Sequence, residues 1–80
     1  MEIKILGAGC PKCNRLEALA REAARELAID ATFTKVTGMD DIMSYDVIST
    51  PALVIDEEVK ASGRIPRKEA IKSWLEAARG

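Results

Sequence analysis

The stretch that decides the fold is IKILGAGCPKCNRL, which covers residues 3–16. Its first residues alternate apolar and charged side chains and then reach glycine and alanine, which is typical of a short strand and a break. From there apolar residues recur every three or four positions, which predicts a helix over residues 11–28. Both cysteines of the chain, Cys10 and Cys13, therefore lie where a strand leads into a helix.

The rest of the chain continues to alternate between strand and helix patterns. In order, we expect a strand at 31–36, a short helix ending at Tyr45, a buried strand at 53–55, an edge strand at 59–61 and a helix opened by Pro66. Asp40 or Asp41 is expected to cap the short helix, with Ile42 and Met43 turned inward. The order β-α-β-(short α)-β-β-α predicts an α/β fold.

The composition describes one small globular domain spanning residues 1–80. Apolar residues make up 48% of the chain, and 12 basic residues face 13 acidic ones, for a net charge of −1. This balance argues against nucleic acid as the main partner. We see no signal peptide at the N-terminus and no apolar run near the roughly 18 residues of a membrane span. We therefore expect a cytoplasmic protein with no membrane partner.

The spacing of the cysteines favours redox chemistry. A disulfide between Cys10 and Cys13 closes a small ring that stabilises a fold by only about 2 kcal/mol, so its reactivity is the better explanation. The helix N-terminus and the ammonium group of Lys12 favour the thiolate of Cys10, and Pro11 stiffens the intervening loop. Cys13 follows nearly one helical turn later. Cys10 is thus predicted to attack a target disulfide, and Cys13 to resolve the mixed disulfide.

The Thr50-Pro51 pair precedes the buried strand and has two interpretations. Proline there can simply punctuate the start of a strand. Alternatively, a cis bond sets Thr50 beside the cysteines, where its backbone can pair with an extended segment of a client protein.

The cysteine pair after the first strand, Thr50-Pro51 before the third, and a hairpin followed by a closing helix together resemble the thioredoxin-like superfamily. The chain is most similar to its small thioredoxin/glutaredoxin-like redox-active disulfide proteins of archaea and anaerobic bacteria. This resemblance implies a central four-stranded mixed β-sheet flanked by helices on both faces, with no bound cofactor. It implies that Cys10 attacks, that Cys13 resolves, and that Pro51 is a cis-proline facing them.

The same resemblance implies a protein-disulfide reductase that acts on disulfide-containing client proteins and is re-reduced by a thioredoxin-reductase-type electron donor. We expect a monomer. Gly9 stands where thioredoxins usually carry tryptophan, and Pro-Lys lies between the cysteines where they carry Gly-Pro. Only Gly63 remains of the glycine pair that many glutaredoxins place near glutathione, which argues against glutathione as a substrate.

Three other functions use the same cysteines. Structural zinc needs four ligands, and the chain has two cysteines and no histidine. A soft-metal carrier for Cu(I) could use both thiolates. However, small heavy-metal-associated domains finish on a strand and usually carry methionine where this chain has Ala8. The third function is that of a redox-inert or sensing domain that only docks to a partner.

Two sets of basic residues each have two interpretations. Lys35 on the second predicted strand is either a solvated edge residue or a group near the cysteines. Arg64, Arg67 and Lys68 form a small basic cluster that is either ordinary surface charge or a docking site for an acidic partner.

Overall fold

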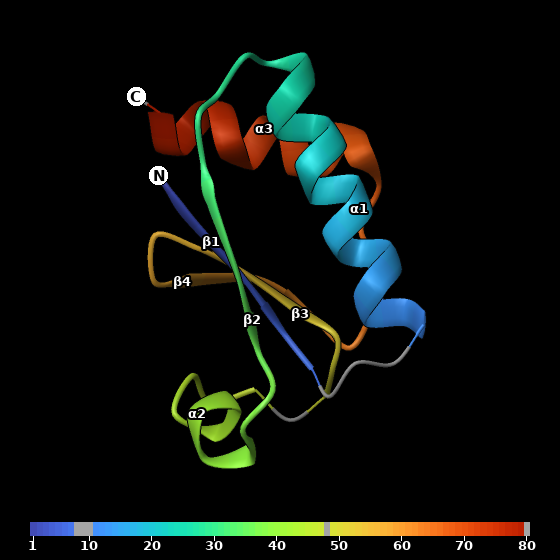
Figure 1. The fold of residues 1–80 in the computed structure, drawn as a ribbon, viewed down its shortest axis with the longest axis vertical. Helices are drawn as coiled ribbons and strands as arrows, with labels where there is room; N and C mark the ends of the chain where they lie inside the picture. The colour runs from blue at the N-terminus through green and yellow to red at the C-terminus, as the bar shows by residue number, and fades with distance from the viewer. Residues whose placement is uncertain (8–10, 48, 80) are drawn as a thin grey trace.

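The computed structural model of the protein describes residues 1–7, 11–47 and 49–79. Its elements, shown in Figure 1, are β1 (Glu2–Leu6), α1 (Pro11–Glu26), β2 (Thr32–Val36), α2 (Met39–Met43), β3 (Ala52–Ile55), β4 (Glu58–Ser62) and α3 (Lys68–Arg79). The predicted order of strands and helices is therefore confirmed.

The strands form one four-stranded mixed sheet in the order β2-β1-β3-β4. β1 is parallel to β2 and antiparallel to β3, and β3 is antiparallel to β4. A parallel pair needs a crossover connection, which α1 supplies between β1 and β2. β4 lies at the edge of the sheet, as its short and polar sequence indicates.

Helices cover both faces of the sheet. α1 and α3 lie on one face, where they bury the larger core, which includes Ile3, Ile5, Leu16, Ala20, Leu53, Ile55, Ile71 and Leu75. α2 covers the other face near the ends of β1 and β3, over the smaller cluster Leu6, Ile42, Ala52 and Val54. Because every residue of β3 is buried, its sequence is a continuous apolar run.

The ends of α1 and α3 differ from the predicted ones. α1 stops at Glu26, and Ala28 lies beyond it with a φ of 55°. The amide of Ile29 donates to the carbonyl of Ala24 at 2.9 Å, and the amide of Ala28 donates to the carbonyl of Arg25 at 3.1 Å. This is a Schellman closure, which usually has glycine at the position of Ala28, so the sequence carries no stop signal there.

α3 begins at Lys68, two residues after the predicted start at Pro66. The carbonyl of Arg67 accepts the first helical hydrogen bond, from the amide of Ile71 at 3.1 Å. Arg67 is therefore the N-cap residue, and Pro66 lies buried in the loop before it.

The prediction for α2 was half right. Ile42 is buried, as expected, but Met43 is 62% exposed. The cap is Gly38, whose carbonyl accepts from the amide of Ile42 at 3.0 Å, and no side chain makes a capping hydrogen bond. Asp40 and Asp41 lie inside the first turn instead, where carboxylates interact favourably with the helix dipole.

Candidate redox site

Cys13 lies in the first turn of α1 and is only 3% exposed. Pro11 and Lys12 precede it on the same turn, and both are exposed. Pro11 is the first helical residue, where the absence of an N–H group leaves no hydrogen bond unmade. Cys10 lies outside the described residues, so the predicted pairing of the two sulfurs remains a prediction.

Gly7 directly follows the last residue of β1 and lies beside Cys13. Its amide donates to the carbonyl of Val36 at 2.9 Å, which fixes the end of β1 against β2. A Cβ atom built on Gly7 would overlap the sulfur of Cys13 and lie 3.8 Å from the Cβ of Thr50. Only a residue without a side chain fits between the sulfur of Cys13 and the Cβ of Thr50.

Gly7 is a site residue that sequence reasoning missed. In the sequence, the Gly-Ala-Gly run directly before the cysteines indicates only a break after the first strand. The signal that could have found it is a glycine between a buried strand and a buried helical cysteine, where the two backbones must approach closely.

The Thr50-Pro51 peptide bond is cis, as the second interpretation of this pair predicted. Thr50 is exposed, and Pro51 is buried. The carbonyl of Pro51 accepts a hydrogen bond from the amide of Gly63 at 2.9 Å, and a Cβ atom on Gly63 would lie 2.8 Å from that of Ser49. The end of β4 therefore lies against the segment that enters β3, and this segment approaches Gly7 through Thr50.

Comparisons with known proteins identify the family of the chain. The family model described as "Thioredoxin domain" matches residues 1–76. The chain belongs to the thioredoxin domain family. The resemblance noted in the sequence is thus confirmed, and with it the enzyme class of a thioredoxin-like disulfide reductase.

Two archaeal relatives are both named thioredoxin. The one from Methanothermobacter thermautotrophicus is 47% identical over 75 residues, which cover 94% of this chain and 97% of the relative. The one from Methanocaldococcus jannaschii is 41% identical over 78 residues, covering 92% of this chain and 90% of the relative. The structure of thioredoxin 1 from Thermosipho africanus aligns with a TM-score of 0.58 at 19% identity, covers both chains completely, and shows the same fold.

Lys35 is anchored to α1, next to the turn that holds Cys13. Its Nζ donates to Oδ1 of Asn14 at 3.0 Å and forms an ion pair with Oε1 of Glu17 at 3.1 Å. The hydrogen bond from Lys35 is the main cause that lowers the pKa of Glu17, and Arg21 adds to it. Lys35 is thus not a fully solvated edge lysine, and in the described part of the chain its polar contacts are with Asn14 and Glu17 and not with a cysteine. These contacts hold α1 against β2.

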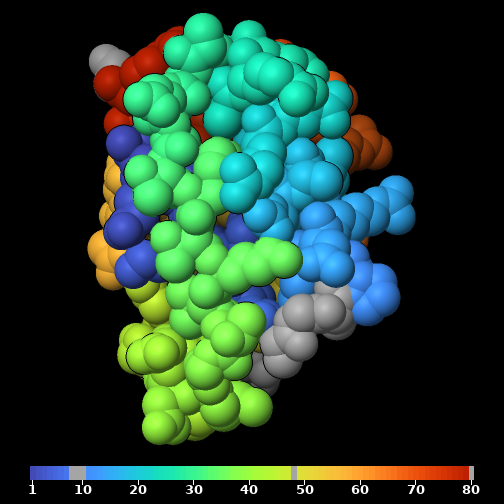
Figure 2. Space-filling view, viewed as in Figure 1, coloured from blue at the N-terminus to red at the C-terminus, as the bar shows by residue number. Residues whose placement is uncertain are grey.

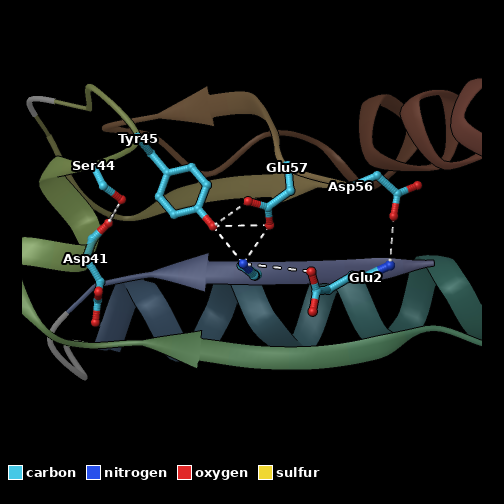
Figure 3. A network of polar contacts seen from close by, with 7 residues as sticks. Glu2, Asp41, Ser44, Tyr45, Asp56 and Glu57 are labelled. Atoms are coloured by element: carbon cyan, nitrogen blue, oxygen red, sulfur yellow. Dashed lines mark hydrogen bonds and ion pairs between the residues drawn. The ribbon is translucent and has the colours of Figure 1, made fainter.

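A second polar network lies on the sheet face opposite α1 (Figure 3). The Nζ of Lys4 donates to the hydroxyl of Tyr45 at 2.7 Å and to Oε1 of Glu57 at 2.5 Å, and it lies 3.7 Å from a carboxylate oxygen of Glu2. The hydrogen bond with Glu57, followed by that with Tyr45, raises the pKa of Lys4. Tyr45 packs against the smaller core cluster of Leu6, Ile42, Ala52 and Val54.

Within residues 1–7, 11–47 and 49–79, no group of three or more cysteine, aspartate or glutamate side chains is placed to hold a metal ion. None of the helices in the described part of the chain is both long and apolar enough to cross a membrane.

Proposed function

We propose that this chain reduces protein disulfides through its Cys-Pro-Lys-Cys dithiol, in which Cys10 attacks and Cys13 resolves. The observation that supports this most strongly is the burial of Cys13 in the first turn of α1, directly beside Gly7 and Thr50. Burial keeps Cys13 away from disulfides in solution, so it suits the resolving role. Cys10 comes first in the Cys-Pro-Lys-Cys sequence, directly before the first residue of α1, and this order suits the attacking role.

The reaction moves two electrons from the dithiol to the client. The thiolate of Cys10 attacks one sulfur of the client disulfide, a Cys10–client disulfide forms, and the displaced client thiolate takes up a proton. Cys13 then loses its proton and attacks the sulfur of Cys10. The second client thiolate leaves, and a Cys10–Cys13 disulfide remains.

Charge at the start of α1 supports the first step. The N-terminus of a helix carries partial positive charge, and Lys12 adds an exposed ammonium group on the first turn of α1. Both stabilise a thiolate more than a neutral thiol.

Thr50 and Pro51 are proposed to position the client. Thr50 is exposed, and its Cβ lies 3.8 Å from the position of a Cβ atom built on Gly7, the position that would overlap the Cys13 sulfur. An extended client segment could pair with its backbone as an added strand, which would bring the client disulfide to the dithiol.

The wider assignment follows from the same chemistry. Clients are proteins that contain disulfides, and a thioredoxin-reductase-type donor re-reduces the dithiol after each turnover. The chain works as a monomeric single domain over residues 1–80, without a cofactor, nucleic acid or membrane. A cytoplasmic location fits a catalytic C-x-x-C pair, since thiols are kept reduced there.

A redox titration combined with an insulin-reduction assay tests the proposal. We expect a potential of about −270 to −180 mV, the range of disulfide oxidoreductases. Cys10→Ser should abolish turnover, whereas Cys13→Ser should accumulate mixed disulfides. Failure to reduce any protein disulfide, together with tight 1:1 binding of Cu(I), would overturn the proposal in favour of a soft-metal carrier.

A further inference from the structure

Most of the cations that form no ion pair lie at the cysteine end of the molecule. Six of the 12 basic residues form ion pairs: Lys4, Arg21, Lys35, Lys60, Lys68 and Lys72. Among the residues that the structure describes, the other six are exposed and form no ion pair. Arg25 and Arg79 are near the C-terminal ends of α1 and α3. The remaining four flank the proposed site: Lys12, Arg15, Arg64 and Arg67. We call these four the cationic rim.

Two members of the cationic rim stand on the first turns of α1, on either side of Cys13. Figure 2 shows side chains of these turns, in blue, projecting beyond the body of the molecule. Lys12 and Arg15 also share one stripe of the helix with Glu22 and Glu26, because their spacings follow the helical repeat.

The other two members lie on the loop between β4 and α3. The loop starts at Gly63, which contacts Ser49 and Pro51 beside the proposed site. It ends at Lys68, which bonds to Glu22 of α1 at 2.9 Å. Residues 64–67 must therefore pass along the same side of α1 that carries the first two cations, and in Figure 1 the orange loop between β4 and α3 passes behind α1.

No carboxylate in the sequence offsets this charge locally. In the sequence, residues 7–16, 47–55 and 61–67 contain no aspartate or glutamate. The whole chain has a net charge of −1, so the part outside the four cations of the rim carries −5. The molecule is therefore polarised, with its positive pole around the proposed site.

We propose that the cationic rim binds acidic side chains that flank the disulfide of the client protein. This inference rests on the proposed function, since it names the kind of client for the same dithiol. Complementary charge of this kind raises the rate of productive encounter and orients the partner. Nucleic acid fits less well, because the three segments hold no aromatic residue on which a base could stack and the rest of the molecule is acidic.

The test uses three disulfide peptides that differ only in their flanking residues, which are acidic, neutral or basic. The full chain, reduced beforehand, reacts with each in a single turnover at low salt and at about 0.5 M NaCl, where screening reduces the Debye length to a few ångströms. We expect the acidic peptide to react about 10-fold faster than the neutral one at low salt, and the basic one more slowly. These differences should largely disappear at high salt.

Charge-reversal variants assign the effect to the rim. Arg15→Glu, Arg64→Glu and Arg67→Glu combined should invert the order of the three peptides, and the three matching Gln substitutions should abolish the preference. Arg25→Glu is the matched control, because Arg25 is exposed on the same helix without an ion pair in the described part of the chain. It lies about 18 Å from Cys13 along the axis. All variants should reduce the small neutral disulfide of mercaptoethanol at the parent rate.

Each outcome points to one conclusion. If no peptide and no small disulfide is reduced, the proposed function fails. If all three peptides react equally at both salt concentrations, the function stands and the acidic-client inference is overturned. If a single-stranded oligonucleotide inhibits at lower concentration than a redox-inert acidic peptide, the rim is a nucleic-acid site and the inference is also overturned.

Discussion

Gly7→Ala is the substitution that most directly tests the geometry around Cys13. The added methyl group would overlap the sulfur of Cys13, lie 3.4 Å from its Cβ and 3.8 Å from the Cβ of Thr50. Ordinary contacts between such atoms are about 3.5–4.0 Å, so the sulfur has to move by more than an ångström. Gly7 and Cys13 are both buried, and neither β1 nor α1 can shift without disturbing the core.

The cost follows from overpacking. An extra methyl group in a closely packed site destabilises a protein by about 1–3 kcal/mol, and we expect the upper part of this range because two anchored backbones meet here. For a domain of this size, about 2–3 kcal/mol lowers the midpoint of thermal unfolding by roughly 10–20 °C. Displacement of the Cys13 sulfur should also slow the resolving step, so mixed disulfides with the client should accumulate.

Thermal unfolding followed by circular dichroism measures the first effect, and acid-quenched gels of the reaction with a protein disulfide measure the second. Gly38→Ala is the control. Gly38 has a φ of −72°, and its added Cβ would meet only the flexible end of Asp41, 3.1 Å away. Gly38→Ala should lower the free energy of unfolding by less than about 1 kcal/mol, the usual effect at a helix cap. A Gly7→Ala protein that unfolds and turns over like the parent would refute the close contact with Cys13.

Three further predictions concern stability and charge. Lys68→Met should lower the free energy of unfolding at neutral pH. Lys68 lowers the pKa of Glu26 below the usual 4.5, so the stabilisation is present above pH 4.5 and is lost as the pH falls through the lowered pKa. The free energies of unfolding of the parent and the variant, measured in urea, should therefore converge in acid. A difference between them that stays the same at every pH would contradict the ion pair. Leu75→Ala should cost about 2–5 kcal/mol in urea denaturation, since Leu75 is fully buried between the helices and the sheet. Lys35→Met should raise the pKa of Glu17 in a carboxyl-detected NMR titration, and an unchanged pKa would show that this lysine is not its main partner.

The regular parts of the fold could be read from the sequence because each repeats one physical pattern. Leu16, Ala20 and Ala23 recur at helical spacing and are all buried on α1. The apolar run of β3 is buried on both faces, as a central strand requires. Such patterns extend over several residues, so no single position decides them.

The ends of the elements depend on single hydrogen bonds and were predicted less well. Ala28 takes the left-handed conformation that usually marks a glycine, because the two amides that close α1 require it. Met43 is exposed because α2 is so short that only Ile42 reaches the sheet. Neither feature leaves a pattern in the neighbouring sequence.

The site divides in the same way. Cys10, Cys13 and the Thr50-Pro51 pair stand out as residue types at a given spacing. The role of Gly7 and the partners of Lys35 depend on register instead. Lys35 lies beside Ile5 in the parallel pair of β1 and β2, and Ile5 faces the core under α1, so the ammonium group of Lys35 is directed to that helix. Lys35 and Ile5 lie side by side only when β1 and β2 are paired in this register, so the sequence alone does not show it.

The paired and unpaired cations should therefore respond to different perturbations. Lys4, Lys35 and Lys68 each join two elements that are distant in sequence, so removing their carboxylate partners loosens the fold. Arg64 and Arg67 hold no such partner among the described residues, and the carboxylate-free segments around them offer none. Reversing the charge of Glu26 should thus change unfolding and leave the preference among peptides intact, whereas reversing Arg64 should do the opposite. A fold that needed the cationic rim for its own stability would show both effects in the same variant.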